Sequence, residues 1–152
     1  MNHFIVDGNN LIGKISLLKK IQQKDKQLSR EKLLFLLDRY FLNKKINVSL
    51  HLDGFPGEKL NSGKIKVIYS EILTADEKIK KQIENFKSRK SITVVTSDLN
   101  LSEFAKVCSC NVISSQNFAK LLRAMDNNDD EESRINQMNN KNEFLKLFGV
   151  QK

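Results

Sequence analysis

Five short apolar runs alternate with segments of helical periodicity along the first 125 residues. The runs are rich in β-branched residues and are bounded by turn formers or charges, so each predicts a β-strand. They are nearly continuous in apolar residues, which is typical of parallel strands that are buried on both faces. Strands that alternate with helices predict an α/β fold, a three-layer sandwich with a central, mainly parallel five-stranded sheet. The predicted strands are residues 3–6, 46–52, 64–69, 91–96 and 111–114.

The segments between the strands carry apolar residues at helical spacing. Residues 11–22 are predicted to be helical. Ser29 is predicted to be the N-cap of a further helix, with Glu31 near the positive end of its dipole. Thr74 and Glu77 form a capping box that begins a third helix. Two further helices follow the fourth and fifth strands. The apolar stripes consist of Leu11, Ile15 and Leu18; Leu33, Leu36, Leu37, Tyr40 and Phe41; Ala75, Ile79, Ile83 and Phe86; Leu101, Phe104, Ala105 and Cys108; and Phe118, Leu121 and Leu122.

The sequence predicts one globular domain followed by a tail. Residues 1–125 hold all the predicted strands and helices of the domain. Within it, residues 54–64 contain three of the six glycines and the only proline, so this segment is either a mobile substrate loop or a long connection. Residues 126–142 are polar and rich in asparagine, which predicts a flexible linker. Residues 143–152 regain apolar spacing and predict a short helix that docks back or a tag that binds a partner.

The positive charge is concentrated in the predicted domain. Residues 1–125 carry 22 Lys and Arg against 12 Asp and Glu, whereas residues 126–152 carry 4 against 6. A basic surface attracts polyanions, of which nucleic acid is the commonest, although lysines spread over a protein with no such partner give the same count. The chain has no apolar run of membrane-spanning length and no signal-peptide pattern, so we expect a cytoplasmic protein without membrane association. Cys108 and Cys110 are expected to be reduced structural thiols.

Four aspartates fall where predicted strands end or where the next helix begins. Asp7, Asp53 and Asp98 follow the first, second and fourth strands, and Asp76 lies in the first turn of the helix after the third strand. The carboxyl ends of parallel strands meet at one edge of a sheet, where ligands bind, so we expect all four on the same rim. Carboxylates that converge repel one another unless a cation neutralises them. Hard oxygen ligands of this kind suit Mg²⁺ or Mn²⁺.

Each aspartate also has an ordinary structural interpretation. Asp7 and Asp53 each precede a glycine, a common turn pair; Asp76 favours its helix dipole, and Asp98 is placed to cap a helix. The joint occurrence of four aspartates on one rim favours the metal site over four separate turns and caps. Asp53 is the weakest of the four, because Asp-Gly turns are so common.

Other chemistries lack their motifs. No Gly-x-Gly-x-x-Gly follows the first strand, and no P-loop motif occurs. His3 and His51 lie in predicted strands, without zinc-ligand spacing to either cysteine. A covalent aspartyl phosphate would call for a second aspartate two residues after Asp7, and Asn9 occupies that place. An acidic cluster without a covalent nucleophile predicts attack by metal-activated water. A phosphatase with an aspartate nucleophile stays open as a less favoured function.

Four segments together resemble the NYN domain of YacP-like ribonucleases, a branch of the PIN-like nuclease superfamily. They are VDGNNLIG near the start, LDG after the second strand, SEILTADEKIKKQIENF, and VVTSDLNLSEFAKVCSCNVISSQNFAKLL. The resemblance extends over about residues 3–124 and implies a parallel sheet, a divalent metal, either Mg²⁺ or Mn²⁺, and hydrolysis of RNA phosphodiester bonds. One departure is Asn9, where family members often carry an aromatic residue.

Carried over position by position, the resemblance implies a set of catalytic residues. Asp7, Asp76 and Asp98 become the metal-binding carboxylates. Asn10 and Ser97 are expected to support them by hydrogen bonds to a carboxylate, a water or the phosphate.

Asp53 is a fourth candidate metal ligand. The remaining candidates come from the chemistry that RNA binding requires. Lysines on helices that begin at the rim are expected to grip phosphates, and an aromatic residue in the glycine-rich loop is expected to stack on an unpaired base. The RNA-binding candidates are Lys14, Lys80, Lys81, Lys106 and Phe55.

Two function classes stay open at this point. The first is a metal-dependent endoribonuclease. The second is a catalytically inactive RNA-binding or ribosome-associated module with the same fold, favoured by the basic domain and by the missing aromatic residue. Chelator-sensitive cleavage of RNA distinguishes them.

Overall fold

The computed structural model describes residues 2–58, 60 and 62–125. The chain divides into two compact units, Met1–Ala119 and Lys120–Lys152, and the described part of the second unit is residues 120–125. The first unit contains the whole sheet. The predicted linker at 126–142 and the predicted helix or tag at 143–152 lie outside the described residues.

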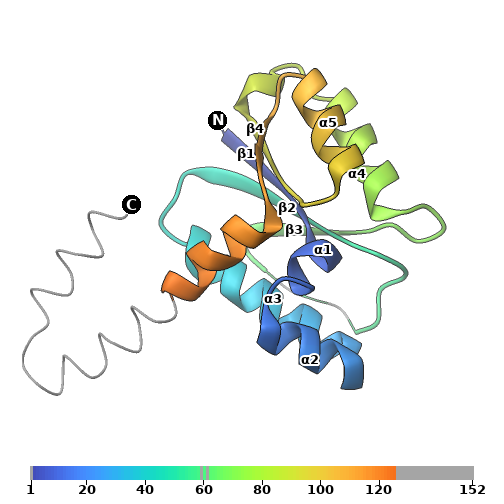
Figure 1. The fold of residues 1–152 in the computed structure, drawn as a ribbon, viewed down its shortest axis with the longest axis vertical. Helices are drawn as coiled ribbons and strands as arrows, with labels where there is room; N and C mark the ends of the chain where they lie inside the picture. Colours follow the sequence, from blue (N-terminus) through green and yellow to red (C-terminus); the bar gives the residue numbers. More distant parts are fainter. Residues whose placement is uncertain (1, 59, 61, 126–152) are drawn as a thin grey trace, which may run out of the picture. The chain divides into compact units, whose positions relative to one another are not determined.

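The first unit is built on a five-stranded sheet in which each strand runs parallel to its neighbours (Figure 1). This confirms the predicted α/β fold. The strand order is β3-β2-β1-β4-β5, so the order reverses at β1, which has β2 on one side and β4 on the other. The strands are β1 (Asn2–Asp7), β2 (Ile46–Leu52), β3 (Ile65–Tyr69), β4 (Ile92–Val95) and β5 (Asn111–Ile113).

Helices lie on both faces of the sheet, with α4 and α5 on one face and α3 on the other (Figure 1). A short 3-10 turn, η1, precedes β4. The helical segments are α1 (Gly8–Ile12), α2 (Ser16–Lys24), α3 (Lys26–Phe41), α4 (Ala75–Glu84), η1 (Arg89–Ser91), α5 (Leu99–Val107) and a helix at 115–125.

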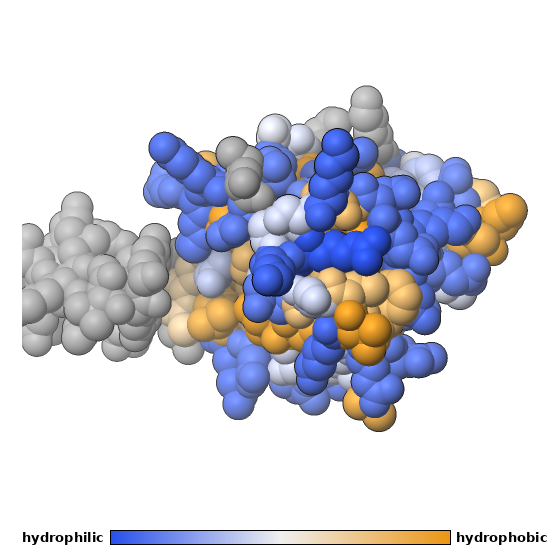
Figure 2. All heavy atoms as spheres, turned by 90° about the horizontal axis from the view of Figure 1, so that it is seen from above, coloured by the Kyte–Doolittle hydropathy of each residue, from blue (hydrophilic) through white to orange (hydrophobic). Residues whose placement is uncertain are grey.

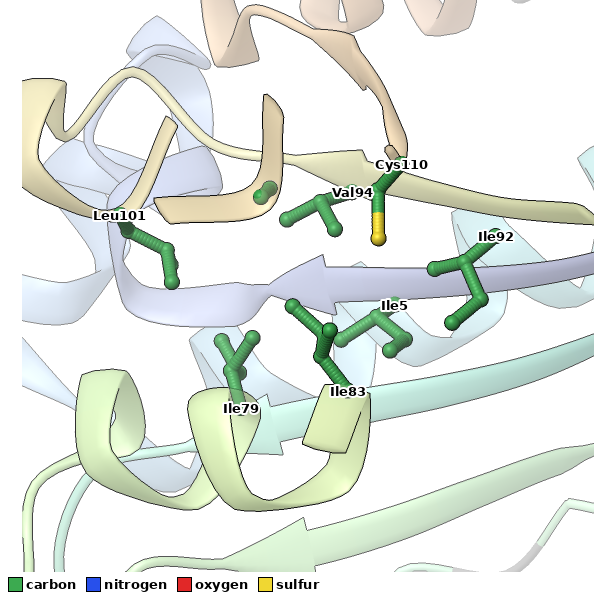
Figure 3. Packing of buried hydrophobic residues seen from close by; sticks show 8 residues of the cluster. Ile5, Ile79, Ile83, Ile92, Val94, Leu101 and Cys110 are labelled. Atoms are coloured by element: carbon green, nitrogen blue, oxygen red, sulfur yellow. The ribbon is translucent and has the colours of Figure 1, made fainter. Parts of the chain in front are cut away.

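The core beneath α4 and α5 fixes where these two helices begin. Ile79 and Ile83 of α4 point toward Ile5 in the middle of β1 (Figure 3). Leu101 of α5 joins them, with Val94 of β4. All five are fully buried, and burying one such side chain contributes about 1.5–3 kcal/mol. This packing sets the position of the first turn of each helix, where two of the four aspartates lie.

The opposite face of β1 is buried under aromatic side chains. Successive strand residues point to opposite faces, so Phe4 lies on the side away from Ile5. The ring centroids of Phe4 and Phe41 are 5.1 Å apart, and those of Phe41 and Phe118 are 6.1 Å apart in a stacked arrangement. Tyr40 adds an edge contact to Phe118 at 5.2 Å. The central strand is therefore covered on both faces, as its continuous apolar run predicts.

The prediction that residues 11–22 are helical is confirmed except at a break in the middle. The chain forms α1 and α2, and the break falls between Ile12 and Ser16. At the break the amide of Lys14 donates to the carbonyl of Leu11, three residues earlier, at 2.9 Å. This is the bond of a 3-10 turn, whereas an α-helix would pair the amide with the carbonyl four residues earlier. The apolar spacing continues through the break because both helices bury residues on the same side, so periodicity alone does not show it.

The predicted N-cap at Ser29 is also wrong. The helix begins at Lys26, and Oδ1 of Asp25 accepts a hydrogen bond from the amide of Leu28 at 3.0 Å. Ser29 lies inside the helix, buried, and its hydroxyl donates to the carbonyl of Lys26 at 2.7 Å. Serine and aspartate both serve as N-caps, and the chain uses the aspartate four residues earlier.

Candidate functional site

The four aspartates lie at the carboxyl ends of the strands, beside the point where the strand order reverses. Asp7 is the last residue of β1, and Asp53 follows β2 by one residue. Asp76 lies in the first turn of α4, and Asp98 is the N-cap of α5. In open α/β sheets, ligands bind in the crevice at this reversal point. The structure thus brings the four candidate carboxylates to one rim.

Asp7 is the most buried of the four aspartates. It is 8% exposed, and its Oδ2 accepts a hydrogen bond from the hydroxyl of Thr96 at 2.9 Å. Burial raises the pKa of Asp7 to about 6, against the opposing effect of the Thr96 bond, and the negative charges of Asp53, Asp98 and Asp76 add to the rise. The other three carboxylates are therefore close enough to repel the one at the end of β1.

Thr96 also connects Asp7 to Asp98. Its Oγ1 accepts a hydrogen bond from the amide of Asp98 at 3.1 Å while its own proton goes to Asp7. Oδ1 of Asp98 accepts from the amide of Leu101 at 3.0 Å, so this carboxylate caps α5. Sequence reasoning gave Thr96 no role, although its place two residues before an aspartate at a strand end is the signal that could have identified it.

Asp76 has one oxygen in an ion pair and one without a partner. Its Oδ2 lies 3.2 Å from Nζ of Lys80, one helical turn further along α4. Its Oδ1 is buried and has no hydrogen-bond partner among the described residues. A buried oxygen in this state marks a place where a water or an ion is expected. The predicted capping box at Thr74 and Glu77 is confirmed, and it holds this turn in place.

Asp53 is fixed at three of its atoms. Its amide donates to Oδ1 of Asn9 at 2.9 Å, its carbonyl accepts from Nη2 of Arg30, and its Oδ1 accepts from the amide of Ala75 at 2.9 Å. Asn9 is the residue at which the chain departs from the family pattern, and here its side chain holds the loop after β2. Asp53, ranked weakest from the sequence, is also the first of the three acids that raise the pKa of Asp7.

Asn10 and Ser97 hold the rim together rather than touching the acids. Oδ1 of Asn10 accepts from the amide of Ser97 at 2.9 Å and from the hydroxyl of Ser115 at 2.6 Å. The hydroxyl of Ser97 donates to Gln116 and accepts from the amide of Ser115 at 2.9 Å. Within the described residues, neither side chain bonds to an aspartate. These contacts join the end of β1 to the end of β4 and to the start of the helix at 115–125.

The four candidate lysines differ in their distance from the rim. Lys80 lies beside the acids, with its Nζ also 5.4 Å from the ring of Phe104. Lys14 is exposed just after α1, while Lys81 and Lys106 are exposed in the last turns of α4 and α5. At 1.5 Å per residue, Lys106 is about 12 Å along the helix from its N-cap. Hydrophilic side chains cover most of the face seen in Figure 2.

The segment at 54–64 is fastened to α3 at the residues that the structure describes. Nη1 of Arg30 donates to the carbonyl of Phe55 at 3.3 Å, and Nε2 of Gln27 donates to the carbonyl of Glu58 at 3.0 Å. The side chain of Phe55 is 60% exposed. Of the two interpretations of this segment, these contacts favour a connection with a defined path, which presents one aromatic ring to solvent.

A pocket of about 570 Å³ lies between this segment and β3. Pro56, Val67 and Tyr69 are among its lining residues. The guanidinium of Arg30 lies over the ring of Tyr69, 5.5 Å from its centroid. The Tyr69 hydroxyl is buried without a hydrogen-bond partner in the described ranges. The volume falls within the range of small-molecule pockets.

Two histidines and a glutamine form a buried polar network on the same sheet face as Asp7. Nε2 of His51 lies 2.7 Å from Oε1 of Gln82, and Nε2 of Gln82 donates to the hydroxyl of Ser49 at 2.9 Å. That hydroxyl lies 2.9 Å from Nε2 of His3. Burial lowers the pKa of both histidines and so favours their neutral forms. The sequence analysis placed both in strands, as found, but did not foresee the network.

The donor set at the rim fits a hard divalent cation. Among the described residues, no three Asp, Glu, His or Cys side chains meet closely enough to hold an ion as they stand. Asp76 nevertheless has a buried oxygen without a partner among the described residues. The pKa of Asp7 is raised by burial and by its acidic neighbours. Asp53 and Asp98 are exposed, and each accepts its amide bond through Oδ1, so the Oδ2 of each has no protein partner among the described residues and is available to an ion.

Gly8 allows the rim to form, and replacing it with alanine should destabilise the fold. An added Cβ would lie 2.6 Å from the carbonyl oxygen of His51 and 2.7 Å from a methyl of Leu52. Because a backbone oxygen cannot rotate away, α1 would have to shift, and Asp7 with it. We expect Gly8→Ala to lower the free energy of unfolding by about 1–3 kcal/mol, measured by urea denaturation. Gly63→Ala is the control, because nothing lies within 4 Å of its added Cβ. Equal stability of the two variants would contradict this packing.

In the described residues, no helix is long and apolar enough to cross a membrane. Cys108 and Cys110 are free thiols, as expected.

Residues 4–148 match the family model of the YacP-like NYN domain. Two crystal structures of Rae1 (YacP) from Bacillus subtilis share the fold, each at 22% sequence identity. The structure of a point mutant gives a TM-score of 0.70, over 91% of this chain and 83% of that one. The other gives 0.71, over 98% and 93%. No curated protein sequence matches the chain.

The family match spans nearly the whole chain, and the parallel sheet is the one that the resemblance implies. At 22% identity the crystal structures support the fold alone. This chain therefore belongs to the YacP-like NYN domain family, which is nuclease-like and part of the PIN-like superfamily.

Proposed function

We propose that this chain is a metal-dependent endoribonuclease that hydrolyses RNA phosphodiester bonds. The observation that carries the proposal is the convergence of four carboxylates on one rim, around the buried Asp7 at the end of the central strand. Burial raises the pKa of Asp7 to about 6, and the charges of the other three aspartates add to the rise. A divalent cation relieves such repulsion. Membership of a nuclease-like family supports the same reaction class.

Asp7, Asp76 and Asp98 are the residues proposed to hold Mg²⁺ or Mn²⁺, with Asp53 as a fourth ligand. Such an ion, when bound, supplies a nucleophilic water and offsets charge on the scissile phosphate. The protein keeps the carboxylates at fixed spacing through Thr96 and through the amides that begin α4 and α5. Asn10 and Ser97 act in this scheme by holding the rim, through the bonds described above.

The basic domain supplies the attraction for RNA. Lys80 beside Asp76 is placed to contact the phosphate nearest the reaction, and Lys14, Lys81 and Lys106 to contact phosphates further away. The exposed ring of Phe55 is proposed to stack on an unpaired base. Binding through several phosphates weakens steeply as the salt concentration rises. RNA in the cytoplasm, including RNA on the ribosome, is the proposed partner.

A second candidate is an inactive RNA-binding or ribosome-associated module. It is favoured by the Asn9 side chain, which holds Asp53 and stands in place of the aromatic residue often found there. It is also favoured by the positions of the acidic side chains, since no three of the described ones are close enough together to hold a metal ion. Such a module would bind RNA with the same salt dependence and would cleave nothing.

Incubation of the purified protein with end-labelled RNA tests the two candidates. We expect internal cleavage with Mn²⁺ or Mg²⁺ and none after the addition of EDTA. A preparation of the Asp98→Asn variant, purified in parallel, identifies any contaminating nuclease. Binding without cleavage, across structured and unstructured RNAs and both metals, would favour the inactive module.

A further inference from the structure

Arg30 is a buried cation whose presence calls for an explanation. It is 4% exposed and lies on the apolar stripe of α3, three residues before Leu33. No carboxylate pairs with it among the described residues, and its Nε is buried without a partner. Placing a guanidinium in such surroundings costs free energy, whereas an apolar side chain there would not. A residue that costs stability at a buried position is expected to serve something else.

The contacts of Arg30 all lead to the loop after β2. One terminal nitrogen donates to the carbonyl of Asp53, and the other donates to the carbonyl of Phe55 at 3.3 Å. The planar group also lies over the ring of Tyr69, which limits its rotation. The guanidinium fork has two terminal nitrogens in a fixed geometry, so it can bridge two carbonyls at once, which an ammonium on a flexible stem does poorly.

The two residues that Arg30 holds have side chains with different surroundings. The carboxylate of Asp53 reaches the first amide of α4 and acts electrostatically on Asp7, at the acidic rim. The ring of Phe55 is exposed to solvent. Between them, Gly54 adopts a φ of +87°, a left-handed conformation that favours glycine, and its amide donates to the hydroxyl oxygen of Ser70 at 2.9 Å. The three-residue turn is thus fixed at each of its members.

We propose that Arg30 is a positioning residue that holds the carboxylate of Asp53 and the ring of Phe55 as one unit, the first for the divalent metal and the second for an unpaired RNA base. The inference rests on the proposed function. In this scheme the buried side chain of Arg30 determines the distance between the metal and the neighbouring base.

The first test compares Arg30→Met with wild type in the absence of metal. We expect the variant to fold, with a melting temperature within a few degrees of wild type, because methionine fills the site without a buried charge. We expect faster hydrogen exchange at the amides of Asp53 and Ala75, since both amide bonds depend on the position of this turn. Arg123→Met, at an exposed arginine of the helix at 115–125, is the matched control and should change neither amide.

The second test measures the two kinds of binding separately. Mn²⁺ affinity, followed by the paramagnetic signal of the free ion, should fall about 10- to 100-fold in Arg30→Met, as is usual when a residue that orients a ligand is removed. Binding of a fluorescein-labelled oligouridylate in EDTA should fall as well. Asp53→Asn should lose Mn²⁺ affinity alone, and Phe55→Ala should lose oligouridylate affinity alone. Loss of both from one substitution is the result that a purely structural arginine would not give.

Arg30→Lys keeps the test decisive if the methionine variant does not fold. It retains the charge but cannot bridge both carbonyls, so it should show weaker Mn²⁺ binding and faster exchange at Asp53. Wild-type affinities and exchange rates in the folded variants would overturn the inference. The proposed function fails separately, if the wild-type protein cleaves no RNA with Mn²⁺, and the exchange measurements remain interpretable in that case because they use neither metal nor RNA.

Discussion

Asp98→Asn should abolish RNA cleavage while leaving the fold intact. Asparagine caps helices as well as aspartate does, so the bond to the amide of Leu101 and the start of α5 should persist. The change removes one negative charge from the rim, and with it a ligand for the proposed metal. We expect the cleavage rate to fall by a factor of about 10² or more, measured under single-turnover conditions with Mn²⁺. RNA binding in EDTA should persist or strengthen, because a charge that repels phosphate is gone.

The chain offers a closely matched control at the start of another helix. Asp25 caps α3 through the amide of Leu28 at 3.0 Å, the same bond at the same distance, and it is not among the acids that raise the pKa of Asp7. Asp25→Asn should therefore cleave RNA at the wild-type rate. If Asp98→Asn retained more than about a tenth of the wild-type rate, the assignment of this carboxylate would be wrong.

Asp7→Asn should make the metal-free protein more stable near neutral pH. The folded protein holds the pKa of Asp7 near 6, above the ordinary value of 3.8, so ionisation of this group disfavours the folded state. The protonated carboxyl of Asp7 contributes to the free energy of unfolding below about pH 4, and this contribution is lost as the pH rises through 6. The asparagine does not ionise and can still accept the Thr96 hydroxyl proton. At pH 7.5 the gain should be on the order of 2–3 kcal/mol, a rise of roughly 5–10 °C in melting temperature.

Thermal melts of Asp7→Asn and wild type in EDTA, from pH 4 to pH 8, measure this gain. The difference in melting temperature should be smallest at pH 4 and should grow with pH, which separates it from a constant packing effect. Excess Mn²⁺ should stabilise wild type by mass action and leave Asp7→Asn nearly unchanged, so the order of the two can reverse. A melting-temperature difference that does not vary with pH would show that folding does not raise the pKa of this carboxylate.

Local sequence pattern was sufficient for the parallel sheet and for the positions of the four aspartates. The central strand β1 is a continuous apolar run because it is covered on both faces, and the capping box at Thr74 is a contact between residues three apart. The broken helix at 11–22 and the false N-cap at Ser29 were missed for a common reason. Apolar periodicity reports which side of a segment is buried, and it is insensitive to where a helix begins or ends.

The parts of the site that the sequence did not predict depend on contacts between distant segments. Asn9 binds the amide of Asp53, 44 residues further along, and Thr96 binds Asp7 across 89 residues. No local pattern encodes such pairs. Arg30 did leave a signal, because a charged residue stands on the stripe that continues through Leu33, and a buried cation at such a position is worth suspecting in other chains.

The strand order has a consequence for when the rim of aspartates forms during folding. The first acid belongs to the first strand and the last acid to the fourth, and β4 reaches its place beside β1 only after the chain has crossed over β2. Such non-local pairing is slow compared with the formation of single helices. The four aspartates therefore converge only after β4 has paired with β1, and any damage that loosens the middle of the sheet should separate Asp7 from Asp98.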